Sequence, residues 1–178
     1  MEHHYPKYYF KDMSYAAIIE WVDKHQPELE GGALFVSATS FFGAIIKWFE
    51  RRGQHHYGFT PSHVGSLVIK DGQLALFDMK PLFARTQDLA HYLATTNEEY
   101  VLMPRHFELD VQRFSKEILK YDGTLYPFLS AISSVFHKFP SKRRKHCSEL
   151  HLACLQHQGL YRDVNSEITP DELYKLMY

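Results

Sequence analysis

This chain of 178 residues has few cysteines and a net charge close to zero. The two cysteines, Cys147 and Cys154, lie seven positions apart, which on one helix corresponds to about 10 Å of axial rise. That separation is too large for a disulfide between them. Unpaired thiols are typical of reducing compartments, so we expect a cytoplasmic protein. The formal net charge is −1, so the overall charge does not favour binding to nucleic acid or to an anionic membrane.

Long apolar runs are also missing. No stretch approaches the roughly 20 apolar residues that a transmembrane helix needs, and the first residues lack the apolar core of a signal peptide. We therefore expect no integral membrane segment. There is no internal repeat, no low-complexity segment and no linker. Apolar residues make up 45% of the chain, which is enough for one domain with a core of its own.

Helix and strand patterns are interspersed along the chain, which predicts an α+β fold. Apolar residues at helical spacing, together with capping residues, predict the helices. These cover Met13–His25, Ser40–Gly53, Gln87–Ala94, Leu109–Tyr121, Phe128–His137, Cys147–His157 and the segment after Thr169. Short apolar runs predict strands at Ala33–Ser37, Ser62–Ile69, Gln73–Met79 and Glu99–Pro104.

The first thirty residues stand apart in this pattern. Residues 1–12 are polar and aromatic, and we expect a loosely ordered arm there. Pro27 is expected to stop the predicted helix Met13–His25, and Gly31-Gly32 is expected to form a turn. We therefore divide the chain into an N-terminal extension, residues 1–30, and a main domain, residues 31–178.

One β-hairpin can be predicted down to its register. Asp71-Gly72 is a strong signal for a two-residue turn. If these two residues form the turn, Lys70 pairs with Gln73, and each step back along the first strand matches a step forward along the second.

This register brings a histidine to a carboxylate. Asp78 faces Gly65, which lies two residues after His63 on the other strand. Side chains two residues apart point to the same face of a strand. His63 and Asp78 are therefore expected to be diagonal neighbours, roughly 7 Å apart at Cα and closer at their side-chain tips.

The two cysteines differ in their surroundings, and Cys147 is the candidate nucleophile. It lies where the basic run Lys142–Lys145 meets the start of a predicted helix. A helix N-terminus and nearby cations favour the thiolate form of cysteine. Two alternatives stay open: Cys147 is an inert, buried side chain, and the basic run is a solvated surface or a patch for nucleic acid.

A thiol nucleophile needs a base, and the base needs a group that orients it. His63 and Asp78 are residues of these types, predicted to lie on one face of the hairpin. The backbone N–H of Cys147, at the start of its helix, is a candidate donor to an oxyanion.

The same residues carry a family resemblance. Ser62–Gly65, then Phe77-Asp78, then Cys147–Leu150 resemble the circularly permuted NlpC-type papain-like hydrolases, in particular the YiiX/YebB-like branch, in which the order along the chain is His, polar residue, Cys. The resemblance covers about residues 31–176. It implies a papain-like fold with a small antiparallel β-sheet or barrel packed against helices.

The resemblance also implies an activity. Cys147, His63 and Asp78 would form the catalytic triad of a cysteine hydrolase that works through a thioester. The substrate would be an amide bond in peptidoglycan stem peptides or other unusual peptides. Relatives with this fold also act as lipid esterases or acyltransferases, so a lipid-ester substrate is equally implied.

The chain departs from the family pattern in three places. Asp78 stands where the branch often has Glu, His146 precedes Cys147 where a bulky or aromatic residue is expected, and residues 1–30 have no counterpart. Many relatives are also exported, whereas this chain shows no export signal.

Other classes of protein fit some of these residues. A non-catalytic binding module could keep the fold. Cys147 and His151 have the i, i+4 spacing of zinc ligands, although no further ligands at defined spacing accompany them. We expect no cofactor, no metal and no nucleic-acid partner. The expected partner is a peptide or lipid-ester substrate, and the oligomeric state is left open.

Overall fold

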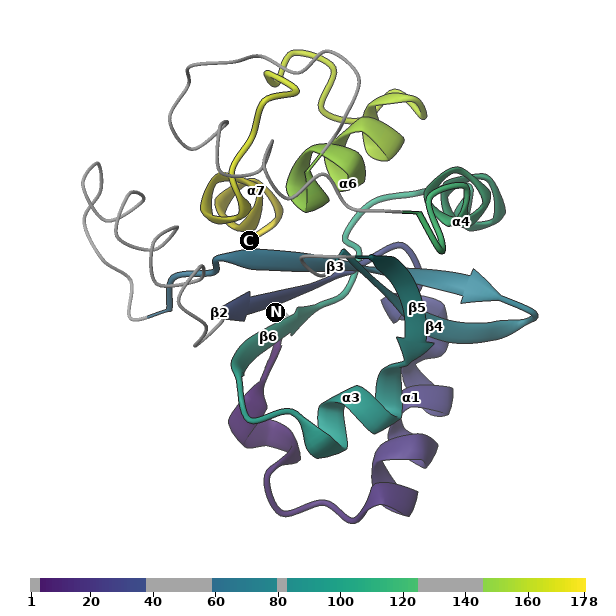
Figure 1. The fold of residues 1–178 in the computed structure, drawn as a ribbon, viewed down its shortest axis with the longest axis vertical. Helices are drawn as coiled ribbons and strands as arrows, with labels where there is room; N and C mark the ends of the chain where they lie inside the picture. The colour runs from purple at the N-terminus through teal and green to yellow at the C-terminus, as the bar shows by residue number, and fades with distance from the viewer. Residues whose placement is uncertain (1–3, 38–58, 80–82, 125–145) are drawn as a thin grey trace.

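The structure, a computed structural model, describes residues 4–37, 59–79, 83–124 and 146–178. It is an α+β fold built on a six-stranded antiparallel sheet in the order β1-β6-β2-β3-β4-β5 (Figure 1). The strands are β1 Tyr5–Pro6, β2 Ala33–Ser37, β3 His63–Lys70, β4 Gln73–Met79, β5 Ala84–Asp88 and β6 Glu99–Met103. The predicted α+β class and the antiparallel sheet are confirmed.

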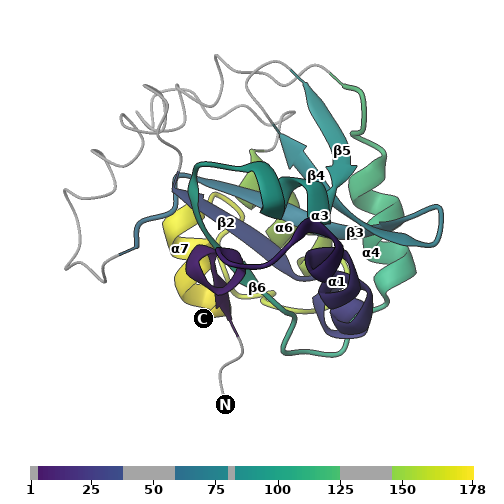
Figure 2. The same ribbon diagram turned by 90° about the horizontal axis from the view of Figure 1, so that it is seen from below.

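Helices cover both faces of this sheet. They are α1 Tyr15–Leu29, α3 Leu89–Thr95, α4 Val111–Leu119, α6 Cys147–Gln156 and α7 Pro170–Met177, with a 3-10 helix, η1, at Lys7–Phe10. Figure 1 shows α1 and α3 below the sheet and α4, α6 and α7 above it. Seen from below, α1 and α3 lie in front of the strands (Figure 2). We call these the α1 face and the α6 face.

Strand alternation divides the core between the two faces. The α1 face buries Leu34, Val36, Leu67, Ile69, Leu74, Leu76 and Leu102 against α1 and α3. The α6 face buries Ala33, Phe35, Val64, Val68, Phe77, Met79 and Met103 against α4, α6 and α7. The central strands are therefore apolar on both sides, which explains their nearly continuous apolar sequence.

Residues 5–10 form β1 and η1, which contradicts the prediction of a loose arm in this part of the chain. β1 pairs with β6 as an edge strand, a position that tolerates Pro6. Phe10 and Trp21 are buried in the core of the α1 face. The prediction that Pro27 stops the first helix is also wrong, because α1 continues through it to Leu29. A proline in the last turn removes one hydrogen bond, and the helix still closes with Glu30 N–H donating to Gln26 O.

The predicted helix at Gln87–Ala94 begins too early. Residues up to Asp88 form β5, which pairs with β4. Asp88 is the N-cap of α3, and its side chain accepts the N–H of His91. The helix therefore starts at Leu89 because the capping carboxylate stands directly before it.

Two predicted helices begin close to their expected residues because capping residues are present there. Asp110 caps α4, and α7 begins with the expected capping box of Thr169 and Glu172, with Pro170 at its first position. Several predictions lie outside the described residues: the helices at Ser40–Gly53 and Phe128–His137, and the basic run Lys142–Lys145.

Candidate functional site

The β3–β4 hairpin has the predicted register. Lys70 pairs with Gln73, and the pairing continues to Ser66 and Phe77. Asp71 and Gly72 have φ values of 52° and 81°, as a type I′ turn requires at both central positions. The Asp-Gly pair therefore fixes which residues of the two strands meet.

His63 and Asp78 lie together, as this register predicts. Nε2 of His63 is 2.5 Å from Oδ1 of Asp78, so the shorter side chain of aspartate reaches the ring directly. Asp78 is only 3% exposed, whereas the side chain of His63 is 23% exposed. The ring is therefore held by a buried carboxylate and still reaches the surface.

A third side chain, which the sequence did not predict, holds the carboxylate. Gln87 on β5 donates its side-chain amide to Oδ2 of Asp78 at 3.0 Å. One oxygen of Asp78 thus accepts from His63 and the other accepts from Gln87. A strand pattern at Ala84–Asp88, with Gln87 on the face of β5 that Leu76 shares on β4, is the signal that could have found it.

Cys147 is the first residue of α6, as predicted. It is partly buried and packs against both apolar clusters of the α6 face. One cluster contains Phe77 and Met79, the two neighbours of Asp78, and the other contains Val64, the neighbour of His63. The packing of α6 on the sheet thus brings the thiol to the hairpin end that carries His63 and Asp78.

The electrostatics of His63 connect these three residues. Burial by itself lowers the pKa of the His63 imidazole. Cys147 and Asp78 oppose this through their negative charges and through side-chain hydrogen bonds, and together they raise the pKa well above its ordinary value. With Nε2 engaged by Asp78, Nδ1 is the ring nitrogen that remains for the thiol.

These groups come from both faces of the sheet. By strand alternation Asp78 belongs to the α1 face, together with Leu74 and Leu76, whereas Cys147 comes from the α6 face. The β3–β4 pairing ends at Ser66 and Phe77, before His63 and Asp78 are reached. His63 therefore lies beyond the last paired residues of the hairpin, between Asp78 on the α1 face and Cys147 on the α6 face.

The start of α6 is fixed by two hydrogen bonds. The backbone N–H of His146, the N-cap residue, donates to Oε2 of Glu149 at 2.9 Å. Ser148, buried beside the thiol, donates its hydroxyl to the carbonyl of Ile168 at 2.5 Å. Backbone N–H groups in a first helical turn have no partner within the helix. The N–H of Cys147 is thus placed to bind a negatively charged oxygen.

The histidine of the i, i+4 pair that suggested zinc has a hydrogen-bond partner of its own. His151 is fully buried, and its Nδ1 lies 2.9 Å from the hydroxyl of Ser66. Among the described residues, no three side chains of His, Cys, Asp or Glu are grouped so that they could hold a metal ion.

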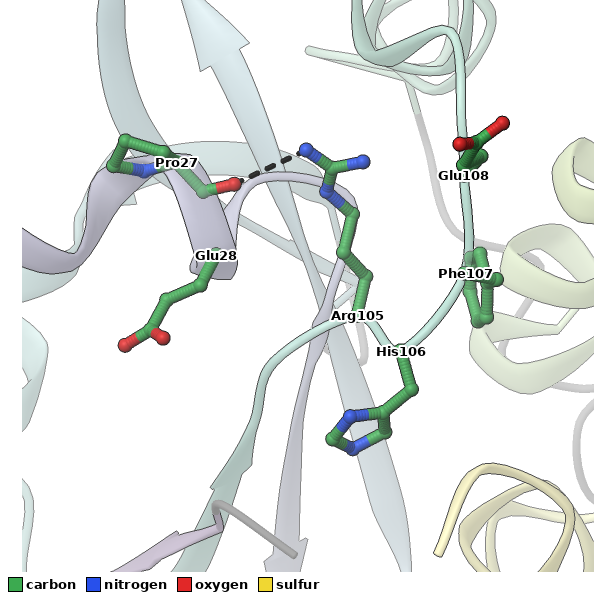
Figure 3. A pocket seen from close by; sticks show the side chains of 6 residues that line it. All are labelled: Pro27, Glu28, Arg105, His106, Phe107 and Glu108. Atoms are coloured by element: carbon green, nitrogen blue, oxygen red, sulfur yellow. Dashed lines mark hydrogen bonds between the residues drawn. The ribbon is translucent and has the colours of Figure 1, made fainter. Parts of the chain in front are cut away.

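A surface hollow lies away from these residues. It has a volume of about 310 Å³ and is formed by the end of α1 and the chain after β6 (Figure 3). Arg105 lies in this hollow, and its guanidinium donates to the carbonyl of Pro27 at 3.1 Å. The same guanidinium forms an ion pair with the carboxylate of Glu30, with Nη2 and Oε1 3.7 Å apart. None of His63, Asp78 and Cys147 lines this hollow.

No family model, no curated protein and no solved structure matches the chain. None of the helices within the described ranges is long and apolar enough to cross a membrane. The chemistry of the site is therefore inferred from its own residues and their geometry.

Proposed function

We propose that the chain is a thiol hydrolase with a permuted papain-like fold, in which Cys147, His63 and Asp78 form the triad. One observation carries this proposal: Nε2 of His63 lies 2.5 Å from Oδ1 of Asp78, and Cys147 packs on the clusters that contain their chain neighbours Val64 and Phe77. An imidazole between a thiol and an orienting carboxylate is the arrangement that nucleophilic catalysis by cysteine requires. The order of the three residues along the chain agrees with the permuted family.

The chemistry follows from the roles of the three residues. His63 takes the proton of Cys147, and the thiolate attacks the carbonyl carbon of the substrate to give a tetrahedral oxyanion. When the oxyanion collapses, the bond to the leaving group breaks and His63 gives it the proton, which leaves a thioester on Cys147. Water, deprotonated by His63, then attacks the thioester and releases the acid and the free thiol.

Three features of the site support these steps. Asp78 fixes the orientation of the ring through Nε2, which leaves Nδ1 to take the proton of the thiol. The N–H groups at the start of α6 supply donors for the oxyanion. The raised pKa of His63 favours an imidazolium beside a thiolate.

The substrate we propose is an amide bond in a peptidoglycan-type or other unusual peptide, as the family resemblance implies. A lipid ester, either hydrolysed or transferred to an acceptor, is the alternative on the same fold, because both reactions pass through the same thioester. A panel of muropeptides and acylated lipids separates the two classes, with Cys147→Ser as the control. Turnover of neither class would contradict the proposed substrates.

The activity itself is tested by alkylation of Cys147 with iodoacetamide as a function of pH. A thiolate paired with His63 reacts well below about pH 7, whereas an ordinary thiol reacts only near about pH 8.5. We expect His63→Ala to abolish the reaction at low pH. His106→Ala, which removes an exposed histidine in the hollow of Figure 3, is the matched control. Reactivity of the wild type only near pH 8.5 would favour a non-catalytic binding module.

A further inference from the structure

His151 makes a second polar contact between the helix that carries Cys147 and the strand that carries His63. It lies on α6, one turn after Cys147, and is fully buried. Its Nδ1 is 2.9 Å from the hydroxyl of Ser66, which is itself buried on β3, three residues after His63.

This contact has an energetic cost that apolar packing would avoid. Nε2 of His151 is buried and has no hydrogen-bond partner among the described residues. The ring packs edge-on to Phe114, with the ring centroids 5.3 Å apart, and burial lowers the pKa of His151 to about 3, so the ring is neutral. An apolar side chain of similar size would fill the same space without an unpaired nitrogen.

The remaining contacts of α6 with the sheet are mainly apolar. Its buried residues include Leu150, Cys154 and Leu155, which belong to the cluster with Val68 and Phe77. Apolar contacts have no preferred direction, so they permit a helix to shift along its axis or turn about it. A hydrogen bond has a preferred distance and angle, so it selects one placement of the helix.

We propose that the Ser66–His151 hydrogen bond positions α6 on β3 and thereby holds the Cys147 thiol against the His63 ring. This inference rests on the proposed function. It makes Ser66 and His151 positioning residues, which act through Cys147 and His63 and do not contact the substrate. A displacement of about 1 Å between reacting groups can cost about a hundredfold in rate, so a directional contact one helical turn away has a measurable effect.

Two substitutions separate positioning from stability. His151→Phe removes the unpaired nitrogen but leaves the buried hydroxyl of Ser66 without its partner, so we expect the melting temperature to change little. Ser66→Ala leaves both nitrogens of His151 without a partner, so we expect the melting temperature to fall. In both variants we expect the rate of Cys147 alkylation at about pH 6 to fall by about tenfold or more. If Ser66 and His151 had only a structural role, the alkylation rate of each variant would instead change in step with its melting temperature.

Two further variants serve as rescue and control. His151→Asn places an amide near the position of Nδ1, so it can keep the bond to Ser66, and we expect it to retain most of the wild-type rate. His157→Phe is the matched control, because His157 lies at the other end of α6, where its exposed ring contacts Glu117 of α4 at 3.0 Å. We expect no change in the pH profile of alkylation for this variant.

The site of alkylation is read by fragmentation of the modified peptide, which distinguishes Cys147 from the buried Cys154. A wild-type pH profile in His151→Phe and in Ser66→Ala would overturn the positioning inference and leave the proposed function intact. Loss of the reaction at low pH in these variants and in His63→Ala supports both. A wild type whose reactivity does not depend on His63 would remove the proposed function, and with it the inference.

Discussion

Nε2 of His63 and Oδ1 of Asp78 lie 2.5 Å apart, although the backbone pairing of their strands has already ended. β3 remains paired with β2 on one side, and β4 remains paired with β5 on the other. The side-chain contact thus joins two strands, each of which is held in place by its other neighbour in the sheet. Its geometry therefore depends on the hairpin register, on Gln87 of β5 and on the absence of a side chain at Gly65.

Asp78→Asn is expected to lower the pKa of His63. The carboxylate is one of the two groups that raise this pKa, and the other is Cys147. Without the negative charge the imidazolium is less stable, so its proton is lost at a lower pH, and alkylation of Cys147, which in the proposal depends on His63, slows at low pH. NMR titration of the His63 ring, identified by its disappearance in His63→Gln, measures the first effect. The iodoacetamide profile measures the second.

An unchanged or higher pKa of His63 in Asp78→Asn would contradict this prediction. The pH dependence of stability is a weaker measure of the same pair. In the proposed ion pair His63 gains the proton that Cys147 releases, so the folded and unfolded chains bind similar numbers of protons near neutral pH. Alkylation and NMR follow the two groups separately.

Gln87→Leu is expected to weaken the hold on Asp78 without removing its charge. The amide of Gln87 donates to Oδ2 at 3.0 Å, and its loss leaves a buried carboxylate oxygen with one donor fewer. Such a loss costs about 1–3 kcal/mol in free energy of unfolding. Because the charge on Asp78 remains, we expect a smaller decrease in Cys147 alkylation than in Asp78→Asn. Urea unfolding and alkylation at about pH 6 give the two quantities. A larger decrease in alkylation than in Asp78→Asn would contradict the proposal that Gln87 acts by holding Asp78.

Asp122→Asn gives the clearest dependence of stability on pH. Burial raises the pKa of the Asp122 carboxyl, but hydrogen bonds from Lys70 and Thr86 outweigh this and lower it below its ordinary value. A lowered pKa stabilises the folded chain at pH values above the ordinary carboxyl pKa, about 3.9. This stabilisation is lost as the pH falls through the folded-state value.

We therefore expect wild type to be more stable than Asp122→Asn at neutral pH, by about 1 kcal/mol, because the groups are partly exposed. The difference should shrink as the pH falls below about 4. Urea unfolding of both proteins across this range measures it. A difference that stays constant down to pH 2 would show that the charge of Asp122 is not responsible. Glu117→Gln, which removes another carboxylate with a lowered pKa, should behave in the same way.

The sequence predicts the part of the site that local chemistry determines. A two-residue Asp-Gly turn permits one register, and that register alone brings His63 to Asp78. The start of α6 at Cys147 and the capping box of α7 also depend on local sequence. The residues that cap the start of a helix lie within one turn of it. The family resemblance then links Cys147 to the hairpin.

Contacts that depend on tertiary pairing could not be predicted in the same way. Ala84–Asp88 has few apolar residues, and it becomes a strand because β4 offers a paired edge. For that reason the sequence predicts a helix at Gln87 and does not predict its contact with Asp78. Likewise, the bond between Ser66 and His151 joins residues 85 positions apart, and nothing in the local sequence of either one indicates the other.

Gly65 is required by a close approach between the two strands of the hairpin. A Cβ atom added to it would come within 2.5 Å of Cδ1 of Leu76 and 3.3 Å of the carbonyl oxygen of Phe77. By strand alternation this added atom would point to the same face as His63, two residues before it on β3, and as Asp78, which faces it on β4. The glycine thus leaves the space in which the two side chains meet.

Gly65→Ala is therefore expected to reduce both stability and reactivity. Overpacking of this kind costs about 1–3 kcal/mol in free energy of unfolding. Relief of the clash would move β3 away from β4, lengthen the contact between His63 and Asp78 and slow alkylation of the thiol at low pH. Adding Leu76→Val removes the δ carbons, so the double variant should regain much of the alkylation rate although it gains no core volume. Wild-type alkylation in Gly65→Ala alone would show that the geometry of the pair tolerates a side chain at this position.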